Sequence, residues 1–211
     1  MDRVVILSRG LNGDFCKFAW LFIALGLLAS PAQAEIVKNK EFRFSLAKPN
    51  GWQNLSFEAY RRRIDREIVS SEDKKRFISS VRRPIIALSK FKEPYDGLNS
   101  TFLITVSRND KLLGQPIKDI GDAFILAMSR TLSTISVYST PKEINIGGIP
   151  AVCVGFYTEG SLTSGHYRVA NEMCVVPRDG RFLLIGIQTE HNDRATLAAL
   201  RSAVGSLRFE R

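Results

Sequence analysis

Residues 151–176 read AVCVGFYTEGSLTSGHYRVANEMCVV, and they predict a β-hairpin that carries one cysteine on each strand. In the first run, Val152 and Val154 alternate with smaller residues, and Met173 and Val175 alternate in the second. Successive side chains of a strand point to opposite faces of a sheet. If Val154 lies opposite Met173, the larger apolar side chains of both strands share one face.

The same register places Cys153 directly opposite Cys174. Opposed residues of an antiparallel pair have Cα atoms about 4.5 or 5.5 Å apart, which a disulfide accepts. We therefore expect a disulfide, worth about 3 kcal/mol in the chain-entropy model. Two free buried thiols are the main alternative. A redox centre would favour a CxxC spacing, and a zinc site needs about four ligands, for which the chain adds only His166 and His191. No metal or cofactor is expected.

The first 34 residues have the layout of a secretory signal peptide. Three basic residues precede the apolar run FAWLFIALGLLA, and the small-x-small triplet Ala32-Gln33-Ala34 follows it. The run is shorter than the roughly 20 residues of a membrane-spanning helix. Cleavage after Ala34 would export the chain to the periplasm or beyond the cell, where disulfides persist. The long basic start leaves an uncleaved anchor as the alternative.

Residues 35–211 are expected to form a single domain, because no linker, repeat or low-complexity tract divides them. This part carries 27 basic and 19 acidic residues, a net charge of +8. Its sequence contains no further segment that could cross a membrane.

Alternating or continuous apolar runs predict about six or seven mostly antiparallel strands. Turn signals at Gly147-Gly148 and Asp179-Gly180 favour hairpins. The run FLLIGI, residues 182–187, is apolar on both faces, as in a strand covered on both sides. The runs outside the first hairpin are residues 42–47, 85–91, 101–108, 142–146 and 182–187.

Apolar residues recur every three or four positions in four further stretches, which predicts helices. They begin near Ser56, Ser70, Pro116 and Asn192, and the last is expected to end at a Gly205 C-cap. The sum is an α+β fold of three layers, with a mostly antiparallel sheet between helices.

The order of these features resembles the PsbP-like fold, which is shared by photosystem extrinsic subunits, Mog-type Ran-binding proteins and many exported bacterial proteins. The stretches that carry the resemblance are FRFSLAKPNGW, NSTFLITV, IGGIPAVCVGFY, RFLLIGI and GSLRF. The resemblance implies an antiparallel sheet between helices. It implies no single function, because one fold hosts many functions, and no family site residue matches a position of this chain.

A catalytic motif would distinguish an enzyme from a binding protein. The sequence contains no HExxH, GxSxG or phosphate-binding glycine loop. His166 falls near the predicted hairpin tip with nothing to mark it as a general base. We therefore expect a non-catalytic envelope protein, with an envelope hydrolase of unrecognised site as the alternative.

The charge is concentrated in residues 60–83, which hold nine basic and four acidic side chains. We predict that residues 55–82 form one or two helices, with the arginines Arg61, Arg62, Arg63 and Arg66 towards solvent. The apolar residues that pack on the sheet are expected to be Phe57, Tyr60, Ile64, Ile68, Phe77 and Val81. A surface of arginines attracts anions. The expected partners are an acidic envelope protein, an anionic lipid headgroup or a polysaccharide, while export disfavours nucleic acid. A basic helix that only keeps the domain soluble is the alternative.

Overall fold

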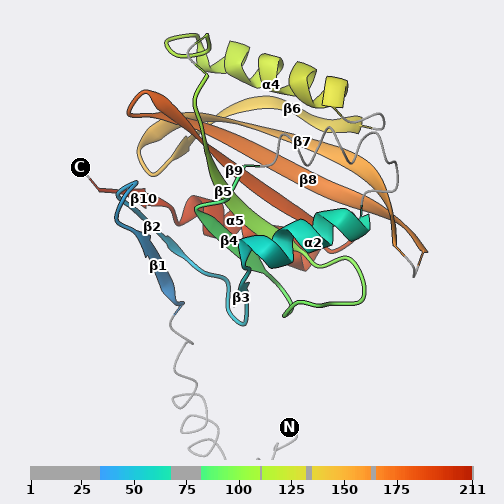
Figure 1. Cartoon of the computed structure of the whole chain (residues 1–211). Helices are drawn as coiled ribbons and strands as arrows, with labels where there is room; N and C mark the ends of the chain where they lie inside the picture. The colour runs from blue at the N-terminus through green and yellow to red at the C-terminus, as the bar shows by residue number, and fades with distance from the viewer. Residues whose placement is uncertain (1–33, 68–81, 110, 132–134, 163–164, 211) are drawn as a thin grey trace, which may run out of the picture. The chain divides into compact units, whose positions relative to one another are not determined.

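The computed structural model describes residues 34–67, 82–109, 111–131, 135–162 and 165–210. Its centre is a seven-stranded antiparallel sheet in the order β3-β4-β5-β9-β8-β7-β6 (Figure 1). The predicted antiparallel sheet is therefore confirmed. Its strands are β3 (Gln53–Asn54), β4 (Ile86–Ser89), β5 (Thr101–Ser107), β6 (Ile135–Ile146), β7 (Ile149–Leu162), β8 (Gly165–Arg178) and β9 (Arg181–Glu190).

The β7–β8 hairpin has the predicted register. Val154 lies opposite Met173 and Cys153 lies opposite Cys174. The two cysteines form a disulfide whose Cα atoms are 4.0 Å apart. The period-two pattern of the two strands was sufficient to find this pairing.

Two short turns join the long strands, and both contain consecutive residues with positive φ. Gly147 and Gly148 (φ 59° and 89°) connect β6 to β7, and Asp179 and Gly180 (φ 50° and 67°) connect β8 to β9. Two positive φ angles are the signature of the turns whose twist matches paired strands, so both hairpin predictions are confirmed.

A second, three-stranded sheet was not expected. It consists of β1 (Ile36–Asn39), β2 (Phe44–Ala47) and β10 (Arg208–Phe209), with β2 in the middle. The residues of β1 and β10 are too few for their alternation to stand out. Phe44 and Leu46 of β2 are nevertheless buried in the main core.

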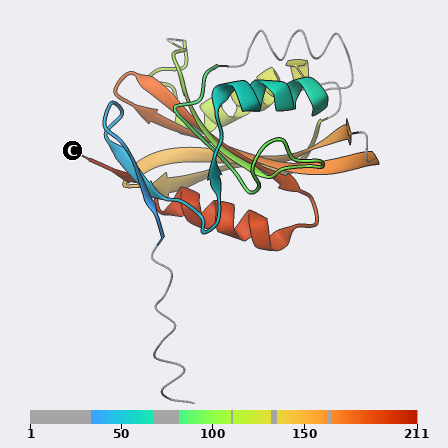
Figure 2. The ribbon, with the colours of Figure 1, turned by 60° about the horizontal axis from the view of Figure 1, so that its bottom comes forward.

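Helices cover both faces of the large sheet (Figure 2). Helix α5 (Arg194–Gly205) packs Leu200 and Ala203 into the main core, with Ile185 and Ile187 of β9. Residues 185 and 187 share a face of the sheet with the disulfide, because Cys174 pairs with Ile185.

The opposite face is covered by α2 (Phe57–Glu67) and α4 (Ile117–Thr131). Ile120 of α4 packs against Val152, Val175 and Phe182 in a second core cluster. The three-layer α+β arrangement is thus confirmed.

Two helix predictions differ from the structure or fall outside it. Gly205 is the last helical residue of α5, and the capping residue after it is Ser206, which has φ −82°. The predicted Gly205 C-cap is therefore wrong by one position. The helix expected after Ser70 lies outside the described residues, as do the packing positions Ile68, Phe77 and Val81.

Candidate functional site

Helix α2 is the element on which the basic surface was predicted. Ser56 precedes it, and the Ser56 Oγ accepts a hydrogen bond from the Ala59 N–H (3.1 Å), as an N-cap does. Ile64 is buried, and Phe57 and Tyr60 are half-buried. The predicted apolar stripe therefore docks this helix on the sheet.

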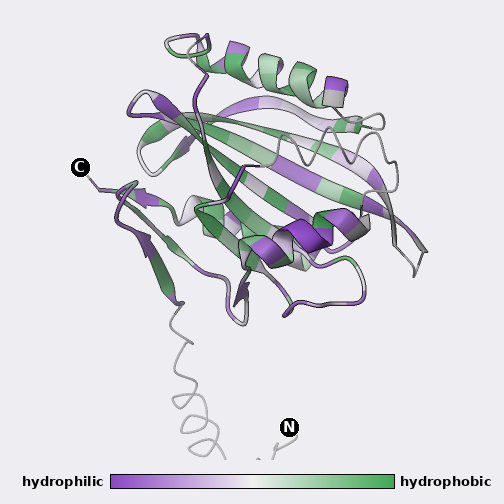
Figure 3. Ribbon diagram, in the orientation of Figure 1, coloured by the Kyte–Doolittle hydropathy of each residue, from purple (hydrophilic) through white to green (hydrophobic). Residues whose placement is uncertain are grey.

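Arg61 and Arg62 lie on the outer side of α2 and are exposed. The Arg61 guanidinium lies 6.0 Å from the centre of the Phe57 ring, one turn earlier. The exposed carboxylates of Glu58 and Asp65 share this surface, which is predominantly hydrophilic in Figure 3. The side chain of Arg66 lies outside the described part.

The expectation that Arg63 faces solvent is wrong. Arg63 is 2% exposed, and its Nη2 donates a hydrogen bond to the Oε1 of Gln188 on β9 (2.9 Å). The same Oε1 accepts a hydrogen bond from the Thr101 hydroxyl of β5 (3.3 Å). A buried guanidinium needs such polar partners, because its desolvation is costly.

The error over Arg63 has a simple geometric cause. Position 63 lies three residues after Tyr60 and directly before Ile64, so it falls within the wide arc that a core-facing helix buries. The prediction placed Arg63 in solvent because the residue is charged, whereas its position on the helix indicates the side that faces the sheet. Arg63 therefore helps to hold α2 on the sheet, and Arg61 and Arg62 are the predicted arginines whose described side chains are exposed. We call these two residues the α2 basic surface.

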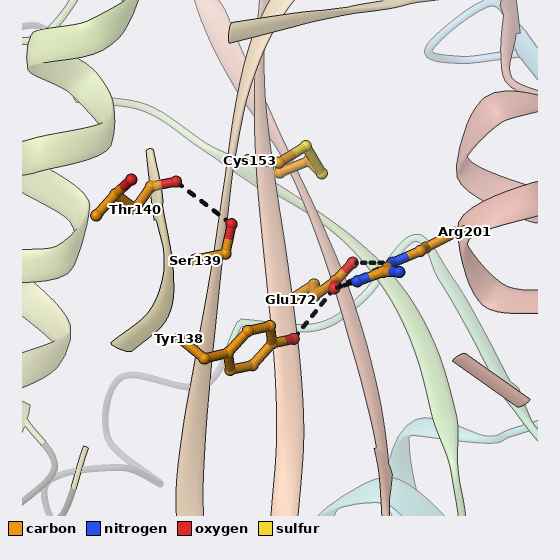
Figure 4. The surroundings of a disulfide bond; sticks show 7 residues. Tyr138, Ser139, Thr140, Cys153, Glu172 and Arg201 are labelled. Atoms are coloured by element: carbon orange, nitrogen blue, oxygen red, sulfur yellow. Dashed lines mark hydrogen bonds and ion pairs between the residues drawn. A yellow bond between two sulfur atoms is a disulfide. The ribbon is translucent and has the colours of Figure 1, made fainter. Parts of the chain in front are cut away.

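A polar network that the sequence did not reveal lies beside the disulfide (Figure 4). Arg201 of α5 forms a two-pronged ion pair with Glu172 of β8, in which Nε lies 3.1 and 3.0 Å from the two carboxylate oxygens and Nη2 contacts Oε1. The Tyr138 hydroxyl of β6 donates to the same Oε1 (3.1 Å). These contacts tie three elements together across one face of the sheet.

Tyr138 lies where the pairing of β6 with β7 is irregular. Between Val137 and Ser139 the β6–β7 register shifts, so one extra residue of β6 lies opposite Gly155. The Tyr138 ring crosses Gly155 so closely that a Cβ there would lie 2.5 Å from ring atom Cε2. Gly155 is therefore required by the close approach of this ring.

The contacts of the network shift the pKa values of two of its members. Burial, then the negative charge of Glu172, raises the pKa of the Tyr138 phenol far above its ordinary value, so Tyr138 stays a hydrogen-bond donor. The hydrogen bonds with Glu172 raise the pKa of Arg201 further. Glu172 binds both Tyr138 and Arg201, so the network stabilises the packing of α5 against β6 and β8.

Both histidines lie at the surface of the described chain. His166 is exposed near the end of the β7–β8 hairpin, where its Cα pairs with that of Ser161, and His191 is exposed between β9 and α5. Within the described ranges, no three His, Cys, Asp or Glu residues are grouped to hold a metal ion. None of the helices in the described part is long and apolar enough to cross a membrane.

The geometry can be compared with known proteins. No protein-family model matches the sequence, and no curated protein matches it. Among solved structures, cyanobacterial PsbP (CyanoP) from Synechocystis aligns over 86% of this chain and 95% of its own, with 12% identity and a TM-score of 0.52. The chain has the PsbP-like fold. The resemblance in the order of sequence features is thereby confirmed at the level of fold.

Two further solved structures align with lower TM-scores. LpqN of Mycobacterium tuberculosis, described as involved in cell envelope biogenesis, aligns over 85% of this chain and 91% of its own, with 13% identity and a TM-score of 0.46. The Ran-binding protein Mog1p of Saccharomyces cerevisiae aligns over 83% and 95%, with 8% identity and a TM-score of 0.48. At such identities the likeness concerns the fold alone.

Proposed function

We propose that this protein is an exported, non-catalytic binding or assembly-accessory domain of the cell envelope, which contacts an anionic partner through the α2 basic surface. In this proposal residues 1–34 are a signal peptide removed near Ala34, and residues 35–211 are the single working domain. The partner is an acidic envelope protein, an anionic lipid headgroup or a polysaccharide.

The orientation of α2 carries the proposal. Ile64 and Arg63 hold the inner side of the helix against the sheet, so Arg61 and Arg62 project outward from a fixed support. Cations on a rigid element meet an anionic partner with little ordering cost. Arg66 lies one turn beyond Arg62, and we include it in the proposed contact.

The carboxylates on the same helix limit how strong the contact can be. Glu58 and Asp65 are exposed beside the two arginines, so the attraction is local and does not extend over the whole helix. Exposed charges are screened beyond about 8 Å at physiological ionic strength. Binding through this surface should therefore weaken steeply as salt is added.

Crosslinking in the native envelope followed by recovery of the protein tests the proposal. An Arg61→Ala/Arg62→Ala variant should lose the crosslinked partner. A Lys118→Ala/Arg130→Ala variant is the matched control, because it removes the same charge from exposed positions on α4. Arg63 stays unchanged, since replacing a buried side chain would confuse lost binding with lost stability.

Equal recovery of a partner by the wild type and both variants would contradict a role for the α2 basic surface. Thermal unfolding of the variants should match that of the wild type, because exposed charges contribute within about 0.5 kcal/mol.

A further inference from the structure

The loop between β4 and β5, residues 90–100, presents an aromatic pair at the surface. Phe91 is 40% exposed, and its ring stacks on that of Tyr95 with centres 4.4 Å apart and planes 16° apart. Lys92 is exposed next to it, and the Lys90 ammonium lies 5.5 Å from the centre of the Phe91 ring. Phe91 is the exposed member of this pair, and Tyr95 is half-buried.

A fully buried side chain fixes the backbone of Phe91. Asn99 is 0% exposed; its Oδ1 accepts from the Phe91 N–H (3.0 Å), and its Nδ2 donates to the Phe91 carbonyl (2.8 Å). The Ser89 hydroxyl donates to the same carbonyl (2.8 Å). The Glu93 carboxylate accepts from Asn99 Nδ2 (2.9 Å) and from the Tyr95 N–H (3.1 Å).

The loop is also tied to α5. Lys90 Nζ donates to the Asp193 carboxylate (3.0 Å) and to the Thr196 hydroxyl (2.7 Å) at the start of that helix. Phe91 is thus held in place before any partner arrives, which lowers the entropy cost of binding through it.

The loop and the α2 basic surface belong to the same end of the sheet. Arg63 of α2 contacts Gln188, and Gln188 pairs with Thr101, the residue at which the chain leaves the loop and enters β5. Helix α2 therefore crosses the sheet at the level where the loop departs, and Figures 1 and 2 show both segments there.

We propose that this loop is an interfacial anchor, with Phe91 entering the surface of an anionic phospholipid bilayer. The proposal rests on the proposed function and names the lipid as its partner. Aromatic side chains beside cations are typical of surfaces that enter the headgroup region, and each cation near an anionic leaflet adds attraction. Here Lys92 and the α2 basic surface supply the cations, because Lys90 is engaged by Asp193.

The size of the apolar surface favours a bilayer over a protein. The other large apolar side chains that are exposed in the described chain lie on β1, α4 and β6, away from this loop: Ile36, Leu126, Val137 and Ile144. One aromatic pair among charges is less than the apolar core of a stable protein interface, whereas it is sufficient for shallow insertion. A polysaccharide bound by charge alone would not require Phe91.

One acidic residue of the loop opposes its contact with an anionic bilayer, and replacing that residue gives a further test. Asp96 is exposed in the same loop, while Glu93 is engaged by Asn99 and the Tyr95 backbone. Replacing Asp96 with asparagine should strengthen binding to anionic vesicles by about fivefold, because one repelling charge is removed.

Vesicle binding tests the anchor directly. The full chain is produced in a host that exports it, the exported form is purified, and vesicles of phosphatidylglycerol and phosphatidylcholine are compared with phosphatidylcholine alone. Phe91→Ser should weaken binding to the anionic vesicles by about threefold to eightfold, as expected for losing the exposed part of one aromatic ring. Leu126→Ser, at a 52% exposed position on α4, is the matched control and should bind like the wild type.

Fluorescence gives an independent readout. Trp20 lies in the expected leader, and Trp52 is 6% exposed. A Phe91→Trp variant should shift its emission to the blue when anionic vesicles are added, and a Leu126→Trp variant should not.

Wild-type binding that is unchanged by Phe91→Ser, or absent from anionic vesicles, overturns the anchor. If Arg61→Ala/Arg62→Ala still loses its crosslinked envelope partner in that case, the proposed function stands and the partner is a protein or a polysaccharide. If Phe91→Ser weakens vesicle binding while the arginine variant retains its partner, the anchor stands and the α2 contact does not.

Discussion

Gly155 offers the most exact test of the network beside the disulfide. In Gly155→Ala the new Cβ would lie 2.5 Å from Cε2, 2.6 Å from Cζ and 3.0 Å from Oη of Tyr138. Carbon atoms do not approach so closely, so the Tyr138 ring must move. It would leave its place beside Tyr157, whose ring centre is 4.4 Å away, and lengthen its hydrogen bond to Glu172.

The expected cost follows from these contacts. Overpacking typically destabilises by about 1–3 kcal/mol, and Tyr138 is half-buried, so water replaces part of the lost hydrogen bond. We expect Gly155→Ala to lower the free energy of unfolding by about 2 kcal/mol. Without the ring, Gly155→Ala should be neutral or slightly stabilising, because alanine restricts the unfolded chain.

Urea unfolding of four proteins measures this coupling: wild type, Gly155→Ala, Tyr138→Ala and the double variant. A double-mutant cycle should give an interaction free energy of about 2 kcal/mol between positions 138 and 155. Equal costs of Gly155→Ala with and without the Tyr138 ring would refute the close-approach argument.

Three further predictions concern export, the disulfide and the start of α5. Mass spectrometry of protein recovered from its source should find an N-terminus at or near Glu35, and an intact leader in the soluble fraction would contradict cleavage. Replacing Cys153 and Cys174 with alanine should lower the free energy of unfolding by about 3 kcal/mol in urea titrations, and two reactive thiols in denatured, unreduced wild type from an oxidising compartment would refute the pairing. Hydrogen bonds with the Thr196 side chain and backbone, and contact with Lys90, lower the pKa of Asp193 to about 2. The stabilisation that the Asp193 carboxylate contributes is therefore present above about pH 4 and is lost as the pH falls towards 2. Asp193→Asn should flatten that part of the pH–stability curve, and an unchanged slope would count against the cap.

The hairpin and its disulfide could be predicted because strand alternation and turn residues are local signals. Val154 and Met173 identify one face, and that assignment determines the partner of Cys153. The run of apolar residues in β9 likewise indicated that helices cover both faces of the sheet. These features depend on residues close together in the sequence.

The partners of Arg63 and Tyr138 could not be predicted, because they lie far away in the sequence. Arg63 is buried because Gln188, 125 residues later, supplies an acceptor. Tyr138 reaches Glu172, 34 residues later, by crossing the neighbouring strand at Gly155, and the alternation of β6 alone does not reveal that approach. The strand pattern did put Glu172 on the face of Cys174, and this was the available signal for the network.

The aromatic loop was missed for a related reason. Its sequence, KFKEPYDGLNS, has the turn residues of an ordinary connection. Its fixed conformation comes from Asn99 and Ser89, whose side chains hold the Phe91 backbone. A buried asparagine that fixes an exposed aromatic residue is visible once the contacts are known.

Site-specific photocrosslinking tests most directly whether the α2 basic surface contacts an anionic envelope partner. A photoreactive residue at position 58 is exposed on α2 and leaves Arg61 and Arg62 intact, and one at position 118 of α4 is the control. We expect position 58 to crosslink an envelope component whose yield falls as salt rises, and position 118 to crosslink none. Equal crosslinking from both positions, or none from position 58 at low salt, would contradict it.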